Sequence, residues 1–229
     1  MTFEFYWPVL WEYRDLLLEG LSITLFLFVV GTVSSILLGF LFGISSAARS
    51  RLLRVVGEVY VELNRNTPLV VKLFFLYFGF GLEAYTAALI GLAMHQSAYM
   101  AEIVRSGIQS VFVGQMEAGL STGLSRAQTM QRIVLPQALF IVIPPLLTQV
   151  LETLKNSSIA MTIAIPELTF QTQQIEAESF RGFEAATAAT LMYLFIGFTV
   201  VGGVHIFESR YVKRRFRLQR LKQDVTTTK

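Results

Sequence analysis

The stretch from Gly20 to Ala48, which contains no charged side chain, constrains this chain more than any other feature. The hydrocarbon core of a bilayer is ~30 Å thick, and a helix needs about 20 apolar residues to cross it. The whole chain is 53% hydrophobic and only 15% charged, whereas soluble domains carry about 25% charged residues. These properties predict an all-α integral membrane protein, because only helices and closed barrels satisfy their backbone hydrogen bonds in lipid.

Further apolar stretches follow the first, and each is close to the length needed to cross a bilayer. The second candidate carries its three charged residues in its first part, and the fourth contains three prolines. Counting the first stretch, the sequence predicts five transmembrane helices, at Gly20–Ala48, Tyr60–Leu82, Ala84–Ala101, Ile133–Leu151 and Ala185–Phe207.

Lysine and arginine gather after the first, third and fifth predicted spans, whereas acidic residues dominate the opposite connections. Because cytoplasmic loops are enriched in Lys and Arg, the N-terminus is predicted outside and the C-terminus inside. Residues 1–19 mix aromatic and acidic side chains, which fits either an interfacial segment or an extension of the first span. The predicted organisation is an N-terminal segment at 1–19, a membrane domain at 20–210 with a cytoplasmic loop at about 112–136, and a cytoplasmic basic tail at 211–229.

Several function classes are disfavoured by the same sequence. The sequence pI is about 9.3, but much of the positive charge flanks apolar stretches, so nucleic-acid binding is not expected. The chain has no Gly-Lys pair, no His-Glu-x-x-His motif and no cysteine, so neither an ATPase site nor a metal site is predicted. His95 and His205 are interpreted as buried, hydrogen-bonded side chains rather than metal ligands. The chain is therefore not predicted to be an enzyme.

A motif between the third and fourth predicted spans is the most specific signal. Glu117, Ala118 and Gly119 are followed by Gly123, then by nine residues and Ile133-Val-Leu-Pro136. This arrangement resembles the EAA loop of ATP-binding-cassette (ABC) importer permeases, and only Gly119 departs from that pattern, which has alanine there. The resemblance implies the type I ABC importer permease fold. It also implies that Glu117, Ala118, Gly119 and Gly123 couple the chain to an ATPase subunit. Ala118 and Gly119 are expected to allow close approach, and Gly123 is expected to let the chain turn after the helix.

Three other segments, at 60–79, 97–108 and 155–169, resemble the polar amino acid permeases that serve histidine, glutamate, glutamine, arginine and opines. The resemblance implies no cofactor in this chain, with ATP and Mg²⁺ bound by the partner ATPase. It also places the chain in a bacterial cytoplasmic membrane. The implied partners are two cytoplasmic ATPase subunits, a second identical or related permease, membrane lipid, and a periplasmic or lipid-anchored substrate-binding protein.

Polar residues within membrane segments are the candidate substrate contacts, because such residues are rare there and usually functional. Asn and Ser are preferred helix N-caps, and a helix N-terminus inside the membrane suits a carboxylate. A substrate site is therefore predicted at Lys155, Asn156, Ser157 and Ser158. The alternative is that these residues cap a loop at the outer surface.

A second polar cluster begins the second predicted span, where Thr67-Pro68 should interrupt the helix because proline has no N–H to donate. Glu62 and Arg65 lie one turn apart and can form an ion pair. Glu62, Arg65, Thr67 and Pro68 are therefore predicted to serve a gating or structural role.

The nature of the substrate follows from the resemblance alone. Asn156 is neutral and does not repel an anion, and the neighbouring segments look most like those of glutamate/aspartate permeases. The expected cargo is therefore a polar and acidic amino acid, with glutamine or another polar amino acid as the alternative. An ATP-independent secondary transporter is the alternative from a different class, although it gives no reason for the cytoplasmic loop motif.

Overall fold

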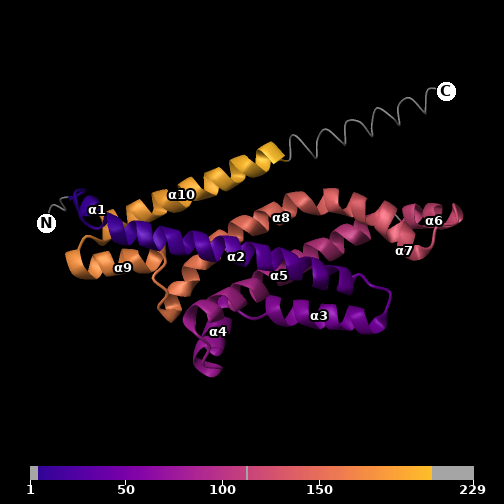
Figure 1. Ribbon diagram of the computed structural model, residues 1–229, viewed down its shortest axis with the longest axis horizontal. Helices are drawn as coiled ribbons and strands as arrows, with labels where there is room; N and C mark the ends of the chain where they lie inside the picture. The colour runs from indigo at the N-terminus through magenta and orange to yellow at the C-terminus, as the bar shows by residue number, and fades with distance from the viewer. Residues whose placement is uncertain (1–4, 112, 208–229) are drawn as a thin grey trace.

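The computed structural model describes residues 5–111 and 113–207 of the chain. All regular structure in those residues is helical (Figure 1). The basic tail predicted at 211–229 and the side chain of His205 lie outside the described part. The elements are α1 (Val9–Glu12), α2 (Arg14–Ser46), α3 (Arg51–Arg65), α4 (Leu69–Phe74), η1 (Phe75–Gly79), α5 (Ala84–Ser110), α6 (Val113–Ser121), α7 (Arg126–Thr129), η2 (Met130–Val134), α8 (Leu135–Ser157), η3 (Ser158–Ile163), α9 (Leu168–Ser179) and α10 (Gly182–Phe207).

Three helical stretches in the described residues are long and apolar enough to cross a membrane: Arg14–Ser46, Arg126–Ile163 and Gly182–Gly203. They contain most of the first, fourth and fifth predicted spans. The first helix begins at Arg14, so residues 14–19 continue it, and the short helix α1 precedes it. The third predicted span forms the first two-thirds of α5, which continues to Ser110.

The second predicted span, from Tyr60 to Leu82, is divided between separate helices. Helix α3 ends at Arg65, and α4 begins only at Leu69. Pro68, which precedes α4, has an extended backbone with a ψ of 145°. Proline has no N–H to donate within a helix, so the predicted interruption at Thr67-Pro68 is confirmed.

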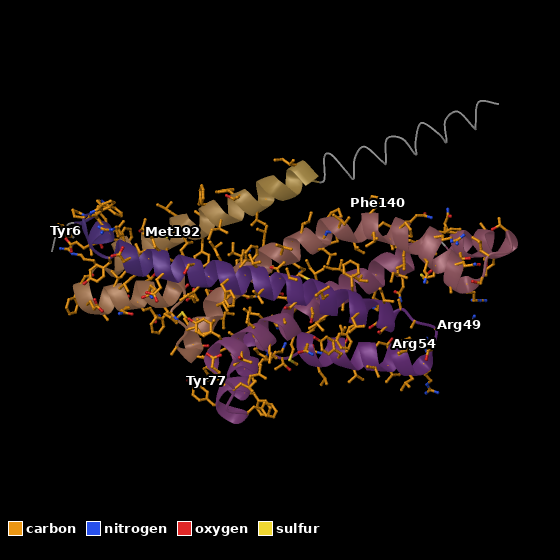
Figure 2. The ribbon with its side chains drawn as sticks, viewed as in Figure 1. Tyr6, Arg49, Arg54, Tyr77, Phe140 and Met192 are labelled. Atoms are coloured by element: carbon orange, nitrogen blue, oxygen red, sulfur yellow. The ribbon has the colours of Figure 1, made fainter. Side chains whose placement is uncertain are left out.

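The long helices α2, α8 and α10 run close to the long axis of the molecule (Figure 1). Helices α1 and α9 lie near the N-terminus at one end, and α6 and α7 lie at the other. The broken segment with α4 projects to one side. Figure 2 shows Tyr6 at the first end, and Arg49 and Arg54 toward the end that carries α6. The basic connection between α2 and α3 therefore lies at the same end as the EAA-like loop.

Small residues allow α2 and α5 to pack closely, and this is the most extensive helix pair among the described residues. Gly31, Ser35, Gly39 and Gly43 recur at every fourth position of α2 and are all buried. A Cβ atom added to Gly39 would lie 2.6 Å from the Cβ of Met100 in α5. Lipid is as apolar as a side chain, so membrane helices associate through such close packing rather than through a hydrophobic driving force.

Buried Glu167 forms hydrogen bonds that hold three helices together near the end of the molecule that carries the N-terminus. Its carboxylate accepts hydrogen bonds from the amides of Thr169 (3.0 Å) and Phe170 (2.9 Å) and so caps α9. It also accepts from the hydroxyls of Tyr193 in α10 (2.9 Å) and Thr24 in α2 (3.4 Å). A buried carboxylate is tolerated only with such partners, so Glu167 fixes α2, α9 and α10 relative to one another.

Helix α5 has an acidic cap at its start. Exposed Glu83 accepts hydrogen bonds from the amides of Tyr85 (3.1 Å) and Thr86 (3.0 Å). These bonds hold the pKa of the Glu83 carboxyl below its usual value, because they favour the charged form. The cap fixes the point at which α5 begins, and α5 is the helix that supplies one wall of the site.

Candidate functional site

A polar cavity of about 280 Å³ lies between α5 and α8. This volume is just below the range for small-molecule sites, ~300–1,000 Å³. Every side chain that lines it is polar or aromatic with a polar group: His95, Gln96 and Tyr99 from α5, and Gln149, Glu152 and Asn156 from α8. The positions recur at three- or four-residue intervals, so each helix contributes one face.

A second hollow of about 310 Å³ lies in the same α5–α8 seam, nearer to α6. Glu102, Ser106 and Gly107 line it from α5, and Pro145 is among the residues that line it from α8. Glu102 forms an ion pair with Arg105, and both side chains are about one-third exposed. The seam therefore carries polar groups from the first cavity toward α6.

The predicted substrate segment at 155–158 is divided between two surfaces. Asn156 lines the polar cavity, whereas Lys155 and Ser158 line a mainly apolar hollow of about 450 Å³ between α8 and α10. Ser157 is fully buried, and its hydroxyl donates to the Leu154 carbonyl at 2.7 Å. Of the four predicted contacts, only Asn156 lies in the polar cavity.

The prediction of a helix N-terminus at this segment was wrong. Residues 155–157 form the last turn of α8, which continues directly into η3 from Ser158. The hydroxyls of Ser157 and Ser158 bond to carbonyls three residues earlier rather than to amides that follow. Because helical hydrogen bonding continues through the segment, it offers no set of unpaired amides to a carboxylate.

The ion pair expected between Glu62 and Arg65 is absent among the described residues. Glu62 accepts a hydrogen bond from the side chain of Asn66 at 3.0 Å. The Arg65 guanidinium instead lies over the ring of Tyr99, 5.5 Å from its centre. Tyr99 also donates from its hydroxyl to the Arg65 carbonyl at 3.5 Å. Arg65 therefore contacts a residue of the polar cavity, while Thr67 and Pro68 form the bend between α3 and α4.

The EAA-like loop forms a short exposed helix, α6, in which Glu117 and Ala118 face outward. Gly123 follows α6 with a φ of +83°, a conformation that glycine adopts without steric cost. This agrees with the turn expected there. Ser125 then starts α7 with a capping box, accepting from the amide of Gln128. The loop is thus a pair of short helices joined by a glycine turn.

Gly119 does not face outward with Glu117 and Ala118, contrary to the expectation that it allows close approach of a partner. It is buried, and a Cβ atom there would lie 2.4 Å from Cγ2 of Thr129 and 3.1 Å from Cδ1 of Ile133. Thr129 occupies the space that a second alanine of the EAA pattern would need. Gly119 therefore serves the packing of α6 on the start of the next long helical stretch.

This packing leads to a prediction. The Gly119→Ala variant should loosen α6 by about 1–3 kcal/mol, because the added methyl overpacks against Thr129. Amide hydrogen exchange in residues 114–121 should become about tenfold faster. The Gly119→Ala/Thr129→Ala double variant should return the exchange toward the parent rate. Equal exchange in the parent and the single variant would contradict the packing role.

Several residues of the polar cavity were not predicted from the sequence. Gln96, Tyr99, Gln149 and Glu152 were not named as candidates, although His95 was expected to be a buried, hydrogen-bonded side chain. The hydrogen bond is confirmed, because Lys72 Nζ lies 3.1 Å from its Nδ1, but the His95 side chain is only partly buried. A search for polar residues at helical spacing within the third and fourth predicted spans would have found Gln96, Tyr99 and Gln149. Glu152 lies just beyond the predicted end of the fourth span at Leu151.

Comparisons with known proteins agree with this architecture. Residues 35–213 match the family described as the binding-protein-dependent transport system inner membrane component. The glutamine transport system permease protein GlnP of Escherichia coli K12 is 35% identical over 200 residues, covering 84% of this chain and 91% of GlnP. The probable glutamine ABC transporter permease protein GlnM of Bacillus subtilis is 35% identical over 210 residues, covering 90% of this chain and 97% of GlnM.

Solved structures of ABC transporters also match this chain. The crystal structure of an amino acid ABC transporter with histidines superposes with a TM-score of 0.83 and 32% identity, covering 92% of this chain and all of the other. The MetNI methionine transporter matches in fold alone, with a TM-score of 0.65 and 18% identity. An all-helical membrane fold, the EAA-like loop and the matched 35–213 region together show that this chain belongs to the binding-protein-dependent transport system inner membrane component family of ABC permeases.

Proposed function

We propose that this chain is the membrane-spanning permease subunit of an ATP-driven importer of polar amino acids. One observation carries the proposal. The exposed loop with α6 connects α5 directly to the helical stretch that ends in α8, and these two helices form the walls of the polar cavity. A force applied to α6 by a partner therefore acts on both walls of the cavity at once.

The proposed mechanism is alternating access. Closure of two cytoplasmic ATPase subunits, which bind ATP and Mg²⁺, displaces α6 and with it α5 and α8. The polar cavity then changes from facing one side of the membrane to facing the other. A second permease supplies the opposite wall, because the polar faces of α5 and α8 line only one side of a path. No step of ATP chemistry falls to this chain.

The proposed topology has five membrane crossings, with the N-terminus outside and the C-terminus in the cytoplasm. The broken stretch at 51–79 and α5 supply the two crossings beyond the three long apolar stretches. Arg49 and Arg54 lie toward the end that carries α6 (Figure 2), which agrees with the positive-inside rule. The site for a substrate-binding protein is then the opposite end, with α1 and α9, in a bacterial cytoplasmic membrane.

Among polar amino acids, we place glutamine ahead of the acidic ones. Both relatives described above are named for glutamine, GlnP as a glutamine transport system permease and GlnM as a probable glutamine permease. The acidic expectation rested on the neutral Asn156, yet the carboxylate of Glu152 lines the same cavity one turn away. Glu152 is paired with Lys155 at 2.8 Å, and none of the six residues that line the cavity is a lysine or an arginine that could pair with an anionic side chain.

The Asn156→Asp variant tests this assignment of the cavity. A second carboxylate beside Glu152 should weaken glutamate binding by about tenfold or more through charge repulsion. Glutamine, whose side chain is neutral, should lose less. The Ser158→Asp variant adds the same charge at the start of η3, on the hollow between α8 and α10, and should leave both affinities near the parent values. Equal effects of the two variants would place the substrate elsewhere.

The function itself is tested with the complex purified through this chain and reconstituted in liposomes. An importer permease should bring ATPase subunits with it, and ATP hydrolysis should rise when a loaded substrate-binding protein and its amino acid are added. Glutamine, glutamate, arginine and leucine should be compared. Uptake by this chain alone, without any ATPase subunit, would overturn the proposal in favour of a secondary transporter.

A further inference from the structure

The side chain of Gln96 is unusual among the groups of the polar cavity. It is 1% exposed and lines the cavity from α5. Within the described residues, neither its Nε2 nor its Oε1 has a hydrogen-bond partner. A buried polar group without a partner destabilises the protein, so a ligand that supplies both a donor and an acceptor would stabilise this amide.

Each class of amino acid side chain offers this amide a different set of hydrogen-bond donors and acceptors. A carboxamide offers an N–H to Oε1 and a carbonyl to Nε2, so both groups are satisfied at once. A carboxylate only accepts, which leaves Oε1 unpaired and facing a negative oxygen. A guanidinium or ammonium only donates, which leaves Nε2 unpaired. An aliphatic side chain pairs neither group.

The neighbouring residue His95 has a defined orientation because of Lys72. Lys72 is buried in α4, and its ammonium donates to the Asn64 carbonyl and lies 3.1 Å from Nδ1 of His95. An ammonium can only donate, so Nδ1 accepts, and the hydrogen of the neutral ring is carried on Nε2. His95 lines the cavity, and its Nε2 then has a hydrogen to donate.

We propose that Gln96 is the specificity-determining residue of this cavity, where its amide pairs with a side-chain carboxamide of the transported amino acid. Lys72 acts as a positioning residue that holds His95 as a donor to a substrate oxygen. Glu152 is the carboxylate of the same cavity and suits the α-ammonium that every amino acid carries. This inference rests on the proposed function, since it assumes that the cavity receives an amino acid.

The test measures direct binding of radiolabelled amino acids to the purified complex in detergent, without the substrate-binding protein and its own selectivity. The parent complex should bind glutamine at least about tenfold more tightly than glutamate, arginine or methionine, because each of these leaves a buried group unpaired. This comparison needs no variant. A parent complex that binds glutamate as tightly as glutamine would overturn the proposal.

Two variants then assign the preference to Gln96. Gln96→Leu should weaken glutamine binding by about tenfold without strengthening that of arginine. Gln96→Glu should weaken glutamine similarly and tighten arginine, because the new carboxylate only accepts. Folding is checked by size-exclusion chromatography of the complex. If both variants fold and keep the parent order of affinities, Gln96 does not set the specificity.

The positioning role of Lys72 has a spectroscopic test. The chain contains two histidines, so the difference between spectra of the parent and a His95→Gln complex isolates the His95 ring nitrogens. Their ¹⁵N shifts should show hydrogen on Nε2 in the parent. In the Lys72→Met complex the two tautomers should mix, whereas Lys72→Gln, which still donates, should retain the parent signal. A Nδ1–H ring in the parent would refute this role.

The failure of this inference differs from a failure of the proposed function. If the complex binds and transports amino acids but without a carboxamide preference, the proposed function is supported and the role of Gln96 is refuted. If no amino acid binds and none stimulates ATP hydrolysis, the proposed function itself falls, and the inference about Gln96 falls with it.

Discussion

The Glu117→Lys variant should insert into the membrane normally but lose substrate-stimulated ATP hydrolysis and coupled uptake by about 100-fold or more. Glu117 is exposed on α6, and within the described residues its carboxylate forms no hydrogen bond or ion pair. Reversing its charge therefore does not disturb the chain itself. A like-charge contact at a protein interface costs several kcal/mol, which corresponds to a loss of this size.

A matched pair separates the charge from the side-chain shape. Glu117→Gln keeps nearly the same shape and should cause a smaller loss than Glu117→Lys. The thermal stability of the permease should be unchanged in both variants. Copurification of the ATPase subunits with each variant, followed by hydrolysis in liposomes, provides the measurement. Undiminished uptake by Glu117→Lys would show that α6 does not transmit the force.

The Gly43→Val variant should be the most damaging to the fold. A Cβ atom at Gly43 would lie 2.7 Å from the carbonyl oxygen of Ala101 and 2.7 Å from Cβ of Val104. Neither is the end of a flexible side chain, so α2 and α5 must move apart. Overpacking costs about 1–3 kcal/mol and occasionally more, and valine adds two further methyl groups. We expect little folded complex.

Gly197 in α10 offers the control, because a Cβ atom there meets nothing within 4 Å. The Gly197→Ala variant should match or slightly exceed the parent stability, since alanine is favoured over glycine inside helices by ~1 kcal/mol. Size-exclusion chromatography after heating measures the folded fraction of each variant. Equal melting of Gly43→Val and Gly197→Ala would contradict the close approach of α2 and α5.

The sequence shows only part of the α2–α5 packing and only part of the EAA-like loop. The recurrence of small residues at every fourth position of α2 is visible in the sequence, but the partner helix is not. The offsets from Glu117 to Pro136 specify a loop with a known pattern, yet they do not reveal that Gly119 faces inward. That fact depends on Thr129, which lies beyond the glycine turn and reaches Gly119 only when α6 packs against the following stretch.

Local patterns also left the segment at 155–158 ambiguous. Asn and Ser can cap a new helix, or they can complete a helical turn by bonding to carbonyls behind them. The structure adopts the second arrangement, because α8 continues into η3 without a break. Only one of the four residues then faces the polar cavity. The sequence prediction treated these four consecutive residues as one site, whereas the helix places them on different faces.

The sequence by itself determined that the chain is a helical membrane protein, that the second apolar stretch breaks at Thr67-Pro68, and that an EAA-like loop joins two membrane segments. These properties depend on composition, on proline chemistry and on local spacing. Only the tertiary structure decided which polar residues share a cavity. His95 and Gln96 lie more than fifty positions before Gln149 and Asn156, and they meet because small residues let α2, α5 and α8 pack closely enough to bring their polar faces together.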